Sequence, residues 1–362
     1  MPPTPIDWTV AEKVAVMVSR RQAPDLDSRT LTRLRDDFAE MTPVAEGLVT
    51  EATGLASLEG PARAEVTDRP GWIRANIRSF RRLLTPLLEK NAGGSLTSRL
   101  PAPVAKATAA AAGAELGAVL GWMSTRVLGQ YDLLLTEDAD MPGDVVYYVG
   151  PNVVSLERRH GFPPKEFRLW IALHELTHRA QFTGVPWMRR HFLDLVDEGV
   201  SIAAPDPKAL AGALTRMAGE IRLGRNPIAE SGLVGVLATP EQQAVLRSIQ
   251  ALMSLLEGHG DIVMNRAASE RVPGAQRFAD TLQRRRESAG GVVKLLQQLI
   301  GMEQKMRQYR EGELFVRAVE AAGGPELFAL VWQDASYLPS LDEVRNPPSW
   351  IDRVGGRSRE IA

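Results

Sequence analysis

The run His174-Glu175-Leu176-Thr177-His178 constrains this chain more than any other feature of its sequence. Residues four apart in an α-helix lie one above the other on the same face, so both imidazoles can reach a single Zn²⁺. The glutamate between them then lies beside the open position of the metal. This spacing is typical of a zinc-bound water with its general base, here Glu175.

The sequence on either side of this motif predicts a helix that is buried on most sides. Pro163 and Pro164 can open the helix, and Gly184 followed by Pro186 can end it. Apolar residues occur on the histidine face and also on a second stripe, formed by Leu169, Leu173, Leu176 and Ala180. Buried imidazoles need partners, and a metal would provide one. The alternative is a pair of core histidines held by ordinary hydrogen bonds.

The composition is that of an ordinary globular protein, and it narrows the possible chemistry. The 362 residues carry a formal net charge of −1 and include no cysteine. The balanced charge gives no reason to expect nucleic acid or a membrane as a partner. Without cysteine, disulfides, thiolate zinc sites and cysteine nucleophiles are excluded, so histidines and carboxylates are the strong zinc ligands that remain. Residues 1–18 contain proline and charge where a signal peptide needs an apolar core, so we expect a cytoplasmic protein.

The hydrophobic periodicity predicts a mainly α-helical protein with a small β-sheet, an α+β fold. We expect an N-terminal helical region at residues 1–140 and a metal-binding catalytic region at 141–362, or one continuous domain. Thr42 and Pro43 predict the cap and first turn of a new helix, and the proline-rich tail at 337–354 is expected on the surface. The predicted helices cover 7–21, 30–58, 72–87, 105–128, 165–182, 187–200, 239–264 and 291–316.

Two further patterns indicate how these elements pack. Gly113, Gly117 and Gly121 recur every four residues in a predicted helix whose apolar run is interrupted by charges. We therefore expect close packing against another helix in a soluble core rather than a membrane span. Residues 144–149, Asp-Val-Val-Tyr-Tyr-Val, form the clearest predicted strand and are followed by Gly150. This strand could pair with an extended peptide, as edge strands do, or lie inside a sheet.

A catalytic zinc takes three protein ligands and keeps its fourth position for water, so a third ligand must come from elsewhere in the chain. Our first candidate is Glu257, because a carboxylate in such an apolar helix is costly unless it meets a cation. Asp261 follows on the same helical face and could hold the free ring nitrogen of a ligand histidine. Glu198 and His191 are alternatives, but they lie in a charged run typical of a solvated face. His259 points away from Glu257 around the helix and is a further alternative.

Tyr309 is the candidate for a second electrophile. It lies on an apolar helical stripe, where a phenol needs a hydrogen-bond partner. There it could donate a hydrogen bond to the oxyanion that develops during hydrolysis. The alternative is a core tyrosine with no catalytic part.

The motif from His174 to His178 resembles the signature of the zincin metallopeptidases. Glu257-x-x-x-Asp261 is similar to the Glu-x-x-x-Asp element of the gluzincin branch, whose glutamate ligates zinc and whose aspartate supports a ligand histidine. The best-known gluzincins place the third ligand much closer along the chain, nearer to the position of Glu198. The resemblance implies a zincin-like catalytic core with zinc as its cofactor.

The resemblance extends over most of the chain from Trp72 to Arg353. In four runs the sequence resembles an actinobacterial family of uncharacterised zinc-dependent metalloproteases. Some members of that family are associated with deazaflavin cofactor biosynthesis. Those runs are Tyr147–Asn152, Leu173–Phe182, Leu255–Met264 and Lys305–Tyr309.

These observations favour a zinc-dependent hydrolase, and within that class a metallopeptidase with a peptide substrate. Two alternatives remain open: a non-catalytic zinc-binding scaffold that binds a partner, and a zinc hydrolase of a small molecule linked to cofactor metabolism. A scaffold needs the two histidines but not the base between them, and this chain has Glu175 as well.

Overall fold

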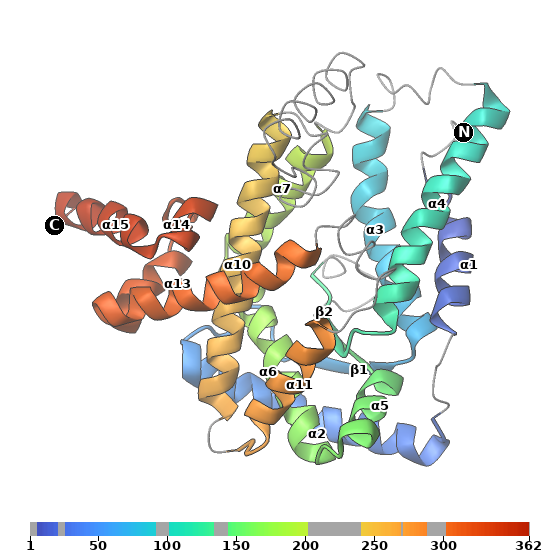
Figure 1. The fold of residues 1–362 in the computed structure, drawn as a ribbon, viewed down its shortest axis with the longest axis horizontal. Helices are drawn as coiled ribbons and strands as arrows, with labels where there is room; N and C mark the ends of the chain where they lie inside the picture. Colours follow the sequence, from blue (N-terminus) through green and yellow to red (C-terminus); the bar gives the residue numbers. More distant parts are fainter. Residues whose placement is uncertain are drawn as a thin grey trace. The chain divides into compact units, whose positions relative to one another are not determined.

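The computed structural model describes residues 6–20, 26–91, 101–133, 144–201, 240–268, 271–287 and 302–361. These residues form a mainly α-helical protein with one small three-stranded sheet, which confirms the predicted fold class (Figure 1). The chain divides into two compact units, Met1–Gly184 with Met264–Phe278 and Val185–Val263 with Ala279–Ala362. The expected division near residue 140 stays a prediction.

The first unit contains the sheet, and its central strand is β3, Val145–Val149. β3 pairs in parallel with β1, Arg63–Thr67, and antiparallel with β2, Gly129–Tyr131. All five residues of β3 are buried, as their β-branched and aromatic side chains predict. The strand itself is confirmed, but its proposed use as an edge for a peptide is wrong, because both of its edges are already paired. Of the three strands, β1 and β2 form the edges.

The helices of the first unit pack around this sheet, and two of them approach each other closely. A Cβ atom added to Gly113 or Gly117 of α4, Ala102–Ser124, would collide with the backbone oxygen of Asp7 or Ala11, respectively. This contact confirms the expected helix-against-helix packing, and the partner is α1, Trp8–Ser19 (Figure 1). The helices are α1 Trp8–Ser19, α2 Ser28–Thr53, α3 Arg69–Asn91, α4 Ala102–Ser124, α5 Gly150–His160 and α6 Pro164–Thr183.

Helix α2 continues through Pro43, so the predicted new helix at Thr42-Pro43 is wrong. A proline inside a helix removes one backbone hydrogen bond, and tertiary packing outweighs that loss here. Thr42 is 1% exposed, and its Oγ1 lies 2.9 Å from the hydroxyl oxygen of Tyr148 on β3. Burial raises the pKa of Tyr148, whose ring stacks on Phe38 at a centroid distance of 3.8 Å. These contacts precede the proline, and Glu46 after it contacts Arg179 of α6, so contacts on both sides of the proline hold α2 as one helix.

The second unit has its own hydrophobic core, which includes the C-terminal tail. Trp350 is fully buried, and its Nε1 donates to the carbonyl oxygen of Tyr337 at 2.7 Å. Its ring packs edge-on against Phe315. The expectation of a tail that only covers the surface is therefore wrong. The helices here are α7 Met188–Ser201, α13 Met302–Ala329, α14 Leu341–Arg345, α15 Pro347–Ile361 and parts of α10 Pro240–Ala268 and α11 Ala275–Glu287.

Among the helices in the described ranges, none is both long and apolar enough to cross a membrane.

The contact between α1 and α4 gives a first testable prediction. In Gly121→Ala, the new Cβ would lie 2.6 Å from the carbonyl oxygen of Ala15 and 2.7 Å from Cβ of Val18. We expect the free energy of unfolding to fall by about 1–3 kcal/mol in a urea titration, as overpacking does. Gly47→Ala is the control, because Gly47 lies inside α2 with nothing within 4 Å of an added Cβ. That variant should gain about 0.5–1 kcal/mol. Equal effects of the two variants would contradict the predicted close packing.

Candidate metal centre

Helix α6 presents the two motif histidines, and it extends one residue beyond the predicted range of 165–182 at each end. It begins at Pro164 and ends at Thr183, with Gly184 as its C-cap. His174 and His178 are both half-buried on one face, with ring centroids 4.7 Å apart and ring planes at 85°. The apolar residues behind them are buried almost completely, including Phe167 at 0% exposure. A rigid helix therefore carries both imidazoles side by side.

The ring of His178 is oriented by a side chain one turn further along the same helix. Its Nδ1 lies 2.9 Å from Oε1 of Gln181, which is fully buried. Since an amide oxygen accepts hydrogen bonds, this contact favours the tautomer in which Nδ1 carries the proton and Nε2 has the lone pair. Such an outer partner is what a metal-binding histidine requires. Gln181 lies on the histidine face in the sequence, but the periodicity does not assign it this role.

Glu175 points at strand β2. Its side chain is 7% exposed, and its Oε2 accepts a hydrogen bond from the backbone N–H of Tyr131 at 3.2 Å. Gly129 lies against the same carboxylate, because an added Cβ there would be 2.8 Å from Oε1. The sequence does not predict this strand, since three residues are too few to show an alternating pattern.

The backbone of β2 explains why its N–H is available to Glu175. Val149 donates to the carbonyl of Leu128, and Asp132 donates to the carbonyl of Val145. In an antiparallel ladder the residues that face the partner strand alternate with those that face away. The backbone groups of Gly129 and Tyr131 therefore point to the side of β2 away from β3, where the carboxylate of Glu175 lies.

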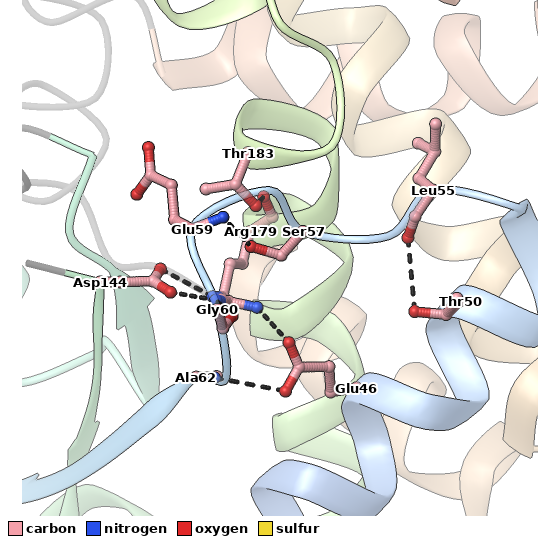
Figure 2. Close-up of polar contacts among 10 residues, drawn as sticks. All are labelled: Glu46, Thr50, Leu55, Ser57, Glu59, Gly60, Ala62, Asp144, Arg179 and Thr183. Carbon is pink, nitrogen blue, oxygen red and sulfur yellow. Dashed lines mark hydrogen bonds and ion pairs between the residues drawn. The ribbon is translucent and has the colours of Figure 1, made fainter.

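A buried guanidinium holds α6 against the sheet. Arg179, next to His178 in sequence, is 1% exposed and contacts both carboxylate oxygens of Asp144, with Nε to Oδ1 at 2.6 Å. It also contacts Glu46 of α2 and the carbonyl oxygen of Gly60 (Figure 2). Burial lowers the pKa of Arg179, but the hydrogen bonds and charges of Asp144 and Glu46 outweigh burial and raise that pKa overall.

Asp144 adopts a strained backbone conformation at this contact. Its φ of 73° lies in the left-handed region, which non-glycine residues rarely enter and which aspartate tolerates better than most. Asp144 directly precedes β3, so the bidentate pair ties the start of the central strand to the helix of the motif. We infer that the ion pair compensates the backbone strain, because such conformations persist where their surroundings determine them.

A second buried arginine secures the other half of α6. Arg168 is 4% exposed in its side chain and contacts both carboxylate oxygens of Glu157 on α5, at 2.7 and 2.8 Å. It also contacts Asp37 of α2. The two arginines bracket the motif at both ends, so its position relative to α2, α5 and the sheet is fixed by directional bonds as well as by packing.

The candidate third ligands occupy different environments. Glu257 is 7% exposed and His259 is 6% exposed, and both lie in α10. His259 stacks on Phe328 and packs against Trp332, with centroid distances of 5.3 and 4.9 Å. Asp261 is half-buried in the same helix.

The two candidates on α7 are less enclosed. Glu198 is exposed, as a residue on a solvated face would be. His191 is half-buried, with its ring centroid 5.8 Å from that of Trp187, and burial lowers its pKa, against an opposing effect of Asp194.

The helices α10 and α13 touch through their backbones beside Glu257. A Cβ added to Gly258 would lie 2.7 Å from Cα of Gly312, and one added to Gly312 would collide with the carbonyl oxygen of Ser254. Tyr309 lies one turn before Gly312 on α13, and its side chain falls outside the described residues. The glycine contact therefore fixes the turn of α10 that carries Glu257.

Three of the predicted site residues form a group that could hold a metal ion. His174, His178 and Glu257 each offer one ligand atom, and these atoms all lie within 4.8 Å of one another. Two imidazole nitrogens and one carboxylate oxygen are a donor set that zinc takes in catalytic sites. Glu175 is not in this group, as expected of a general base.

A mainly helical fold with a histidine pair and a buried glutamate on one helix defines a metal-dependent hydrolase of the zincin type. A model of the zincin-like metallopeptidase family matches residues 6–351, and the chain belongs to this family. The chain is also similar to a solved structure from Chloroflexus aurantiacus, described as a candidate hydrolase with a novel fold. The two share 32% identity and a TM-score of 0.69, over 97% of this chain and 99% of the other. No curated protein matches this chain.

The buried ion pairs of Arg179 with Asp144 and Glu46 give the second prediction. In Arg179→Met, two carboxylates with little access to water lose their cation, so we expect the free energy of unfolding to fall by about 3–5 kcal/mol in a urea titration. Arg317→Met is the matched control, because Arg317 is 57% exposed and pairs with Glu313 one turn away. Its loss should be below about 0.5 kcal/mol. If the two losses are similar, Arg179 does not have the structural role inferred here.

Proposed function

We propose that this chain is a zinc-dependent metallopeptidase in which His174, His178 and Glu257 hold the metal and Glu175 is the general base. The observation that carries the proposal is the position of Glu175. Its carboxylate is buried against the backbone of β2, on the helix of the two histidines, and outside the ligand group. A scaffold would need no carboxylate there.

The residues of the site fit zinc by their chemistry. Both histidines are half-buried and Glu257 is almost fully buried, and two imidazole nitrogens with one carboxylate oxygen are a donor set that zinc takes in catalytic sites. Bound zinc would lower the pKa of its water and polarise a substrate carbonyl. Residues of the chain would orient the ligand and accept the proton. His178, oriented by Gln181, would present its lone pair to the metal, and Glu175 would accept the proton of the water.

The family of the chain supports a peptide as the substrate, because a model of the zincin-like metallopeptidase family matches residues 6–351. The outer edge of β2 is not the basis for this choice, since the N–H of Tyr131 already binds Glu175 and Gly129 packs against the same carboxylate. A hydrolase of cofactor metabolism would use the same zinc chemistry, and the family match is why we favour a peptidase.

Two further residues complete the proposed site. Asp261, four residues after Glu257 on α10, would hold the outer nitrogen of His174, since Gln181 already holds that of His178. Tyr309 would donate a hydrogen bond to the developing oxyanion. The cytoplasmic location and the link to deazaflavin biosynthesis stay predictions from the sequence.

The third prediction separates the base from the ligands. Glu175→Gln should retain about one equivalent of zinc by elemental analysis, because the residue is not a ligand. Hydrolysis of any peptide that the wild-type protein cleaves, identified by mass spectrometry of a peptide mixture, should be lost. His178→Ala is the control and should lose zinc and hydrolysis together. Hydrolysis that survives in Glu175→Gln would rule out this residue as the base.

The fourth prediction concerns the third ligand. Glu257→Gln should weaken zinc binding strongly in a competition titration with a chromophoric chelator. Asp261→Asn should weaken it by roughly 10- to 100-fold, as loss of an outer partner does. Glu198→Gln is the control and should bind zinc like the wild type, because Glu198 is exposed. Loss of zinc in Glu198→Gln with normal binding in Glu257→Gln would reverse the assignment.

A further inference from the structure

Strand β2 meets the side chain of Glu175 at a position where a residue larger than glycine would collide with that side chain unless the side chain moved. A Cβ added to Gly129 would lie 2.6 Å from Cγ, 2.9 Å from Cδ and 2.8 Å from Oε1 of Glu175. These are its three nearest neighbours, and all belong to one side chain. Real Cβ atoms essentially never approach other heavy atoms closer than 3.0 Å. The space that a side chain would fill at residue 129 is thus taken by the carboxylate of Glu175.

The carboxylate has little freedom to move aside. Its other oxygen, Oε2, accepts from the N–H of Tyr131 at 3.2 Å, and the whole side chain is 7% exposed. β2 therefore contacts Glu175 in two ways, through the N–H of Tyr131 and through the missing side chain of Gly129.

The elements on both sides of this contact are themselves fixed. β2 is held by its register with β3, in which Gly129 lies opposite Tyr148. α6 is held by the bidentate contact of Arg179 with Asp144, the residue before β3. The distance between Gly129 and Glu175 is therefore set by the packing of a helix on a sheet, and a larger residue would have to displace the carboxylate.

We propose that Gly129 is a positioning residue for the general base: the absence of its side chain lets β2 hold the Glu175 carboxylate at one place beside the histidine pair. This inference rests on the proposed function for its catalytic consequence. The contact itself does not depend on that function, so the two can be tested separately.

The first test measures the contact without any assay of activity. Thermal unfolding is followed for the wild type, Gly129→Ala, Glu175→Ala and the double variant, all without added zinc. Gly129→Ala should lower Tm in the wild-type background, and the loss should disappear in the Glu175→Ala background, because the colliding atoms are gone. A loss of the same size in both backgrounds would overturn the proposal. If Gly129→Ala does not fold, recovery of folding in the double variant supports the proposal, and failure to recover overturns it.

The second test measures the consequence for catalysis with a peptide that the wild type cleaves. At full zinc content, Gly129→Ala should lower kcat by about 100-fold, the effect of a displacement on the order of 1 Å, while KM changes little. Gly150→Ala is the matched control, because its Cβ would meet Leu34 and Val66 at 3.2 Å and lies away from Glu175. Its kcat should stay within about two-fold of the wild type.

The outcomes distinguish this inference from the proposed function. If no peptide is cleaved by the wild type but the Tm coupling is present, the positioning contact stands and the peptidase function fails. If peptides are cleaved and kcat is unchanged in Gly129→Ala, the function stands and the positioning role is overturned.

Discussion

The position of α6, the helix of the two motif histidines, depends on one buried cation. Arg179 gives α6 a bidentate bond to Asp144 and a further contact to Glu46, and these residues belong to three segments far apart in the sequence (Figure 2). Buried ion pairs need not add net stability, but removing one partner leaves a buried charge unpaired. Such a cluster therefore specifies which surfaces meet. Because Arg179 adjoins His178, and Asp144 adjoins the central strand, the cluster links the histidine face of α6 to the sheet. Arg168 does the same toward α2 and α5 at the other end of the motif.

The local parts of this arrangement can be predicted from the sequence, because short-range physics determines them. The proline pair and Gly184 mark the ends of α6, and the β-branched and aromatic run marks β3. The glycines of α4 predict a close helix contact, although not its partner. Pro43 led to a wrong prediction, that of a new helix start. Its local preference is outweighed by the contacts of Thr42 and Phe38 with Tyr148. The tail misleads for a similar reason, because prolines suggest a loop while Trp350 is a core residue.

The tertiary parts of the site were harder to predict. An arginine within an apolar helix does not reveal that two carboxylates will meet it, and Asp144 looks like an ordinary polar residue before a strand. β2 is three residues long and has no periodic signal, yet it supplies the N–H that binds Glu175. The choice of Glu257 as a metal ligand rested on its burial within an apolar helix, and its 7% exposure agrees with that reasoning. Periodicity can place a carboxylate on a buried face, but it does not identify the cation it meets.

In the proposed function one helix must perform two tasks, and the geometry separates them. The histidines must leave lone pairs facing outward, and they are half-buried with one ring held by Gln181. The base must not become a fourth ligand, because the metal then loses its site for water. A glutamate between two ligand histidines is close enough to do so unless something holds it aside. Here β2 holds it, through the N–H of Tyr131 and the space beside Gly129. The pairing of β2 with β3 and the contact of Arg179 with Asp144 then fix β2 relative to α6, so the small sheet determines where the carboxylate of Glu175 lies.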